Sequence, residues 1–157
     1  TGDIICNFDA DSVFSSSDCL DRLTQPILDN NAVLTDCDLM FDYTQIPPNK
    51  LEEMYYPQMA VDSLNRLQQT APYAVLEPGS CISRTAYIEC GGFADVDKWE
   101  LFNLSARMFW LYPSMILNIP GVSVITSARR VIKLGRLGLI DTLNYNNAMR
   151  KDQIIQL

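Results

Sequence analysis

The stretch Asp3-Ile4-Ile5-Cys6-Asn7-Phe8-Asp9-Ala10-Asp11-Ser12 decides how this chain is interpreted. Its apolar first half predicts a buried strand, and the aspartates at positions 9 and 11 predict the loop that follows the strand. In open α/β sheets, ligands bind at the carboxyl ends of the strands. Asp9 and Asp11 can both turn toward one divalent cation, because hard cations prefer oxygen ligands. The alternative is a solvated turn, since Asp is a common turn former.

The 157 residues, 48% of them apolar and 10% aromatic, are enough for one ordinary hydrophobic core. The sequence has no repeat of fixed period, no signal peptide and no apolar run long enough to cross a bilayer. Five cysteines without a C-x-x-C pair, and the lack of histidine, argue against a zinc site. This cysteine usage predicts reduced, mostly buried thiols in a cytoplasmic protein.

Charge is distributed unevenly along the chain. Residues 1–100 contain 17 acids and 5 bases, whereas residues 101–157 contain 2 acids and 7 bases. The acidic part argues against nucleic acid as the main partner. The basic C-terminal part can meet phosphates or the anionic inner face of a membrane, and a solvated basic helix face is the alternative.

The first half of the chain predicts two helical regions around one strand. Asp18 and the serines before it offer N-cap oxygens to a short helix that Pro26 should interrupt. Apolar residues alternate with acids over 32–41, which favours an irregular strand. Asn49 and Glu52 form a capping-box-like start for a helix that Pro57 should limit or kink, and helical spacing continues to about residue 70.

The second half predicts two further strands and two further helices. The strands cover 73–76 and 121–126, and the helices cover 84–90 and 99–112. The Gly91-Gly92 pair supplies the positive φ of a helix C-cap, and Pro113 ends the second helix. A basic helix is expected from Ser127.

Four motifs in this order resemble a known family. They are Asp9-Ala10-Asp11, Ser83-Arg84-Thr85-Ala86-Tyr87 leading to Gly91-Gly92-Phe93, Glu100 with Leu104 and Arg107, and Thr126-Ser127-Ala128-Arg129-Arg130 followed by Gly135. Together they resemble the second, acceptor-side half of a bacterial family 2 glycosyltransferase. The resemblance covers roughly residues 1–138 and leaves 139–157 as a loosely docked tail. It implies a partial GT-A fold, which is an α/β fold with a mixed sheet and flanking helices.

The resemblance also implies a metal-dependent transfer of sugar from a nucleotide-diphospho-sugar to a saccharide or lipid-linked acceptor hydroxyl. In such enzymes the two aspartates of the Asp-x-Asp motif, here Asp9 and Asp11, hold Mn²⁺ or Mg²⁺ against the diphosphate. The metal neutralises the leaving diphosphate as the anomeric carbon is attacked. Arg129 and Arg130 would approach the diphosphate from the C-terminal side.

The sequence departs from the family pattern at the base. The family carries a Glu-Asp pair whose Asp deprotonates the acceptor, whereas this chain has Glu100 followed by Leu101. Either Glu100 acts as the base or this copy is impaired. The difference matters because one step along a helix rotates a side chain by about 100°.

Two other functions stay open. Phe8-Asp9-Ala10-Asp11-Ser12 also resembles the first motif of haloacid-dehalogenase phosphatases, although no later Gly-Asp or Asp-Asp pair follows an apolar run. The chain can also be a degenerate GT-A-like domain kept for binding, which Leu101 favours.

The family has roughly a hundred further residues before the aligned part, with the first strands and the nucleotide-base pocket. We therefore expect this chain to be part of a longer protein. The strand ending at Phe8 should then present an unpaired apolar edge, which favours a homo-oligomer.

Overall fold

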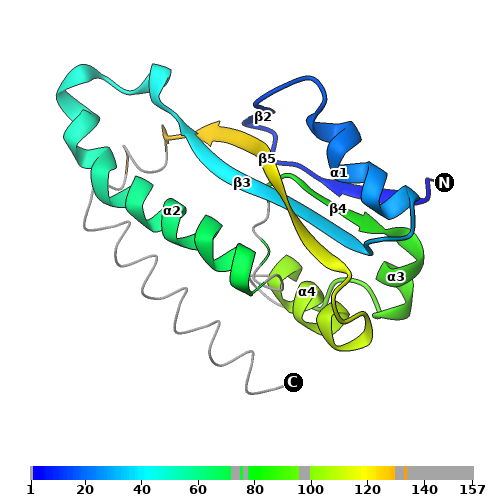
Figure 1. Ribbon diagram of the computed structural model, residues 1–157. Coiled ribbons are helices and arrows are strands. Elements are labelled where there is room, and N and C mark those ends of the chain that lie inside the picture. Colours follow the sequence, from blue (N-terminus) through cyan, green and yellow to red (C-terminus); the bar gives the residue numbers. More distant parts are fainter. Residues whose placement is uncertain (1, 72–74, 76–77, 96–99, 130–132, 134–157) are drawn as a thin grey trace.

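The computed structural model describes residues 2–71, 75, 78–95, 100–129 and 133. These residues form a mixed sheet with helices on both faces, which confirms the predicted α/β class (Figure 1). In chain order the elements are β1 (Ile4–Asn7), β2 (Ser12–Phe14), α1 (Cys19–Leu28), β3 (Leu34–Asp42), the 3₁₀ helices η1 (Tyr43–Gln45) and η2 (Pro48–Met54), α2 (Tyr55–Thr70), β4 (Ser80–Ser83), α3 (Arg84–Glu89), α4 (Glu100–Leu111) and β5 (Ile116–Ser127).

The strand order is β1-β4-β3-β5-β2, so the first two strands of the chain lie at opposite edges. β3 and β5 are parallel, and the other neighbours are antiparallel. Only the segment Phe8–Asp11 joins the two edge strands. Crossing four strand spacings in a flat sheet takes about 19 Å, close to the full reach of so short a segment. Because this segment also contains a turn, the sheet must curl, and the curl brings the two edges together.

One face of the sheet is covered by α1. Cys37 and Cys81 point to this face from β3 and β4, and Val122 and Val124 point to it from β5. The helix contributes the buried side chains of Cys19, Leu23 and Ile27. The hydroxyl of Thr35 donates to the backbone carbonyl of Leu23 at 2.7 Å, which fixes the helix on the strand.

The other face is covered by α3 and α4 at one end of the strands. The buried cluster joins Leu34, Ile82 and Ile116 of the sheet to Ala86 of α3 and to Leu101, Leu104 and Met108 of α4. These three residues form the core face of α4, the helix predicted over 99–112, which Pro113 follows. Farther along the same face, α2 packs on β3.

The strand predicted over 73–76 is only partly testable, because 72–74 and 76–77 lie outside the described residues. The only strand in this region begins later, at Ser80, among the residues that the structure describes. Ser80–Ser83 fits between β1 and β3 because its Cys81 and Ile82 fill opposite core faces.

β5 is longer than the predicted strand 121–126. It continues through Pro120 and Gly121 as a bulge, since β3 advances from Asp36 to Asp38 while β5 advances from Asn118 to Ser123. A bulge releases residues from the ladder, so a proline without an N–H is tolerated there. Arg22 of α1 donates to the carbonyls of Pro120 at 2.6 Å and Gly121 at 3.1 Å.

Both prolines lie in a terminal turn of their helix and break neither one. Pro26 does not interrupt α1, which continues to Leu28, because Pro26 lies in the last turn and its carbonyl accepts from the N–H groups of Asn31 and Ala32. Pro57 lies in the first turn of α2, where an N–H has no helical partner. None of the described helices combines the length and apolar composition needed to cross a bilayer.

Candidate functional site

Asp9 and Asp11 lie on a tight turn after the end of β1. The Ser12 N–H donates to the Asp9 carbonyl at 3.1 Å, which closes a four-residue β-turn over Asp9–Ser12. Both acidic residues are exposed. The rings of Phe8 and Phe14 flank the turn with centroids 4.6 Å apart, so aromatic packing holds its two ends together. We call Asp9–Ser12 the acidic turn.

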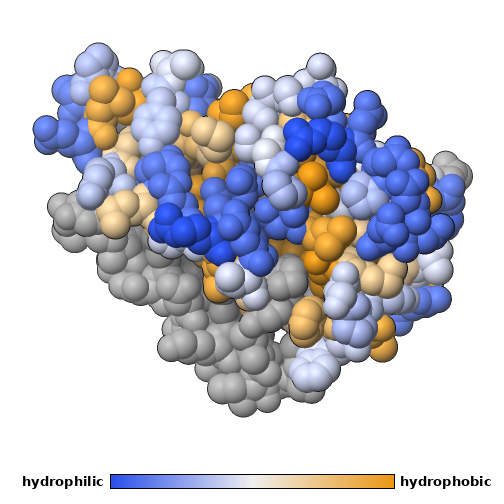
Figure 2. Space-filling view, viewed as in Figure 1, coloured by the Kyte–Doolittle hydropathy of each residue, from blue (hydrophilic) through white to orange (hydrophobic). Residues whose placement is uncertain are grey.

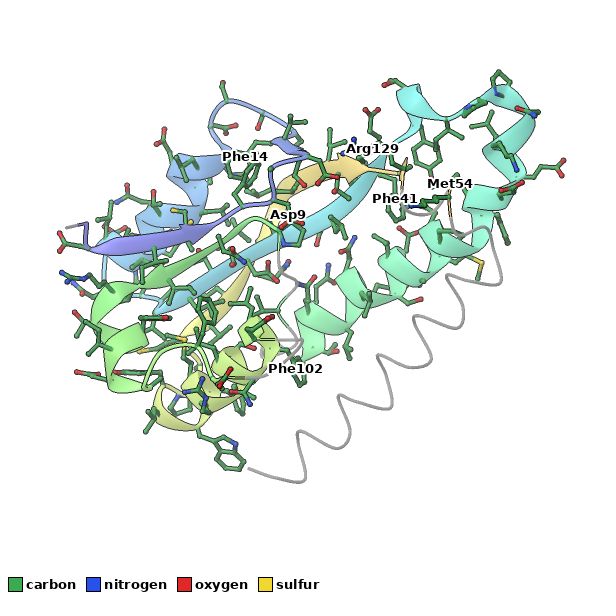
Figure 3. All side chains as sticks on the ribbon, turned by 180° about the vertical axis from the view of Figure 1, so that it is seen from behind. Asp9, Phe14, Phe41, Met54, Phe102 and Arg129 are labelled. Atoms are coloured by element: carbon green, nitrogen blue, oxygen red, sulfur yellow. The ribbon has the colours of Figure 1, made fainter. Side chains whose placement is uncertain are left out.

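Arg129 reaches the acidic turn from the far end of the chain. β2 pairs with β5 so that Ser12 lies opposite Thr126, and Arg129 follows three residues later. Its Nη2 is 3.2 Å from Asp11 Oδ2, and its Nε donates to Ser127 Oγ at 3.0 Å. Figure 3 shows Asp9, Phe14 and Arg129 at the same end of the sheet. Arg130 lies outside the described residues.

The acidic turn offers oxygen ligands but no closed metal cage. In the described part of the chain, no three His, Cys, Asp or Glu side chains lie close enough together to hold a metal ion. Asp9 and Asp11 therefore supply at most two side-chain ligands. Such an open, carboxylate-only donor set fits Mg²⁺ or Mn²⁺, which bind through one or two carboxylates and complete their shell with water and phosphate oxygens.

Glu100 does not join this cluster. It is the first residue of α4 and half-exposed, and it has no hydrogen bond or ion pair with any described residue. Phe102, two residues along the same helix, lies well apart from Asp9 and Arg129 in Figure 3. Leu101, the next residue, is buried in the core under β3 and β4.

Arg107 has a structural role. Its guanidinium donates to the backbone carbonyls of Cys90 and Gly92, and its Nε donates to Asn103 Oδ1 at 2.9 Å. Gly91 and Gly92 have φ values of +79° and +69°, which confirms the predicted left-handed C-cap after α3. Arg107 therefore fastens this cap to α4.

A buried polar layer between α2 and the sheet was not predicted. The Asp36 carboxylate is 1% exposed and accepts from the Gln68 amide of α2 and from the Cys37 N–H. Burial raises the pKa of Asp38, and the nearby amide of Asn118 lowers it in part. Among the described residues, Asp38 Oδ1, Asn118 Nδ2, Gln68 Oε1 and Ser80 Oγ are buried without hydrogen-bond partners. The alternation of acids with apolar residues over 32–41 was the available sign of this layer.

An open groove lies beside η2, at the end of the molecule that carries Arg129. Its volume is about 770 Å³, and its walls combine apolar and aromatic side chains with two acids and an amide: Tyr43, Leu51, Glu52, Met54, Tyr55, Gln58, Met59 and Asp62. Figure 2 shows hydrophobic residues on the surface where η2 leads into α2. The Tyr43 hydroxyl donates to Gln58 Oε1 at 2.7 Å, and the Gln58 amide donates to Asp62 Oδ1 at 2.7 Å.

The groove adjoins the end of β5. Ala128, next to Arg129, is buried against Ile46 and Met54, and Phe41 packs on the same cluster. Figure 3 shows Arg129, Phe41 and Met54 close together. Met54 therefore lines the groove and also packs in the cluster that holds Ala128, the neighbour of Arg129.

The structure thus brings together Asp9, Asp11 and Arg129 of the predicted site residues and leaves Glu100 apart. Comparison of the chain with protein-family models, with curated proteins and with solved structures found no match.

Proposed function

We propose that this chain is the acceptor-side part of a metal-dependent glycosyltransferase that uses a nucleotide-diphospho-sugar. The observation that carries the proposal is the ion pair between Asp11 and Arg129, residues 118 positions apart. A diphosphate site bridged by a metal needs carboxylates for the cation and a guanidinium for the phosphate oxygens. The pairing of β2 with β5 brings Asp11 and Arg129 close together.

In this proposal Asp9 and Asp11 hold Mn²⁺ or Mg²⁺, which supplies charge neutralisation for the departing diphosphate. Arg129 exchanges its carboxylate partner for a phosphate oxygen when the donor binds. The exchange costs little, because the Arg129 side chain is 71% exposed and exposed ion pairs contribute only about 0.2–1 kcal/mol. Phe8 and Phe14 keep the turn in place during the exchange.

The groove beside η2 is suited to the acceptor rather than the donor. The carboxylates of Glu52 and Asp62 would repel a diphosphate. The tyrosine and methionine side chains can pack against a neutral molecule, and the carboxylate and amide oxygens can accept hydrogen bonds from its hydroxyl groups. Its volume falls within the range of small-molecule sites, about 300–1,000 Å³. A saccharide or lipid-linked acceptor has this chemistry.

A second function is a binding domain that has lost transfer activity. It is favoured by the burial of Leu101 at the position where the family carries its base. Such a domain would keep the acidic turn and Arg129, and would bind the nucleotide sugar without consuming it. Phosphatase activity is a weaker alternative, because both aspartates are exposed and one of them is paired to Arg129.

The test is calorimetry with UDP and GDP in the presence and absence of Mn²⁺, on the longest available form of the protein. We expect Mn²⁺ to bind weakly alone and more tightly with the diphosphate. Asp9→Asn and Asp11→Asn should each weaken Mn²⁺-dependent binding by about tenfold or more, equivalent to about 1.4 kcal/mol. Asp21→Asn, an exposed acid on α1, is the matched control. Unchanged binding in both turn variants would reject the site.

A further inference from the structure

β1 and β4 carry two cysteines directly opposite each other. Cys6 pairs with Cys81 in the antiparallel register, and their Sγ atoms are 3.2 Å apart. Both thiols are free, Cys6 being exposed at the sheet edge and Cys81 buried on the α1 face. Two sulfur atoms at hydrogen-bond distance need to approach by only about 1.2 Å to reach the S–S bond length of about 2.05 Å.

The hydrogen-bond pattern of the ladder gives this pair the geometry of a cross-strand bridge. The Arg84 N–H donates to the Asp3 carbonyl at 2.9 Å, so Asp3 and Arg84 form a hydrogen-bonded pair. Hydrogen-bonded and non-hydrogen-bonded pairs alternate along an antiparallel ladder, which makes Cys6–Cys81 a non-hydrogen-bonded pair three steps later. In such pairs the Cα atoms are about 4.5 Å apart, inside the disulfide range of about 4.4–6.8 Å.

The neighbouring thiol of Cys37 is engaged elsewhere. It is fully buried, and its Sγ donates to the Gly79 carbonyl at 3.3 Å. Cys19 lies on α1, where its sulfur is within hydrogen-bond distance of the Ser15 and Ser16 hydroxyls. Cys90 belongs to the core on the opposite face of the sheet. Cys6 is thus the thiol that solvent reaches, and Cys81 is the thiol it faces.

We propose that Cys6 and Cys81 form a reversible disulfide that fastens the strand leading into the acidic turn to β4. With hydrogen peroxide as the oxidant, the Cys6 thiolate attacks a peroxide oxygen, the O–O bond breaks, and Cys6 becomes a sulfenic acid while water is released. The Cys81 sulfur then attacks the Cys6 sulfur, the S–S bond forms, the S–O bond breaks, and a second water leaves. The two thiols lose two electrons and two protons, and the peroxide accepts them.

Burial raises the pKa of the Cys81 thiol, and its contact with Cys6 and the proximity of Cys37 act in the same direction. Because the thiolate is the attacking species, the raised pKa slows the second step. Reduction begins at Cys6, because a reducing thiolate can reach the exposed sulfur. Since Asp9 follows Cys6 by three residues, the bridge fixes the base of the acidic turn.

The experiment treats the whole protein with a small excess of hydrogen peroxide, blocks the remaining thiols under denaturing conditions and maps the peptides without reduction. We expect a peptide pair joined through Cys6 and Cys81, loss of two of the five thiols, and full recovery with dithiothreitol. Cys90→Ser should still form the bridge, whereas Cys6→Ser should keep all its thiols. Hydrogen exchange of the β1 amides should slow after oxidation in the wild type and not in Cys6→Ser.

Three outcomes would overturn the proposal. They are oxidation of Cys6 to sulfinic acid with Cys81 still free, a bridge between Cys37 and Cys81, and a bridge between Cys6 residues of two molecules. None of these results depends on metal or nucleotide binding, so the disulfide and the proposed transferase can fail independently.

Discussion

Gly79 is the residue at which one added methyl group should do most damage. It precedes β4 with φ at +84°, and its N–H donates to the Asn7 carbonyl at 3.0 Å. A Cβ atom at this position would lie 2.6 Å from Cys37 Sγ and closer still to Val124 Cγ2. Both neighbours are fully buried in the core under α1, so neither side chain can move into solvent.

The cost of Gly79→Ala has two parts. A left-handed backbone costs an L-residue about 1–2 kcal/mol, and overpacking a well-packed core costs about 1–3 kcal/mol. Reduced entropy of the unfolded chain returns about 0.4–1 kcal/mol. We therefore expect the free energy of unfolding to fall by about 2–4 kcal/mol, a large share of the roughly 5–15 kcal/mol typical of a domain.

Gly91→Ala is the matched control. Its φ is +79°, but a Cβ there would meet nothing closer than Arg107 Nη1 at 3.8 Å, so only the backbone cost applies. Urea unfolding followed by circular dichroism should show Gly79→Ala less stable than Gly91→Ala by about 1–3 kcal/mol. Equal losses in the two variants would refute the close approach of β4 to β3 and β5 at Gly79.

Further predictions concern the site and the buried acids. Arg129→Gln frees Asp11, so calorimetry should show Mn²⁺ alone binding up to about fivefold more tightly, while Mn²⁺-dependent binding of UDP weakens. Because burial raises the pKa of Asp38, the folded protein should lose stability as pH rises from the ordinary value of 3.8 through the raised value, and Asp38→Asn should remove that loss in urea titrations at several pH values. Glu100→Gln should abolish sugar transfer while leaving UDP binding intact if Glu100 is the base, and full activity would exclude that role. Light scattering over a concentration series should detect an oligomer formed through the exposed edge of β1, and a monomer at tens of micromolar, an order-of-magnitude working concentration, would exclude it.

Short sequence patterns predicted those elements whose formation depends on residues close together in the chain. The strand before Asp9, the C-cap at Gly91-Gly92 and the helix that Pro113 follows are each set by residues a few positions apart. The sequence predicted only that Asp11 and Arg129 would both serve a proposed diphosphate site, and it did not predict their ion pair. Its physical cause is the register of β2 on β5, which no local pattern reveals.

Features that depend on the whole sheet were not predictable. β5 passes through Pro120 because a bulge and the guanidinium of Arg22 satisfy the local backbone, and both come from tertiary structure. The position of β4 follows from its pairing with β1 on one side and β3 on the other, and both partners are distant in sequence. The polar layer around Asp36 appears only when Gln68 of α2 is placed over the strand.

In the proposed function, the metal site and the base would lie in separate parts of this fold. The acidic turn is held by Phe8, Phe14 and the pairing of β2 with β5, whereas the position of Glu100 is set by the packing of α4 on the opposite core. In the proposed function Leu101 stands where a transferase would carry its base, and its side chain fills that core without contact to the acidic turn. A copy that has lost its base would therefore still bind a nucleoside diphosphate with Mn²⁺, so binding by itself cannot distinguish an active transferase from a binding domain. Sugar transfer by the wild type, compared with Glu100→Gln, makes that distinction.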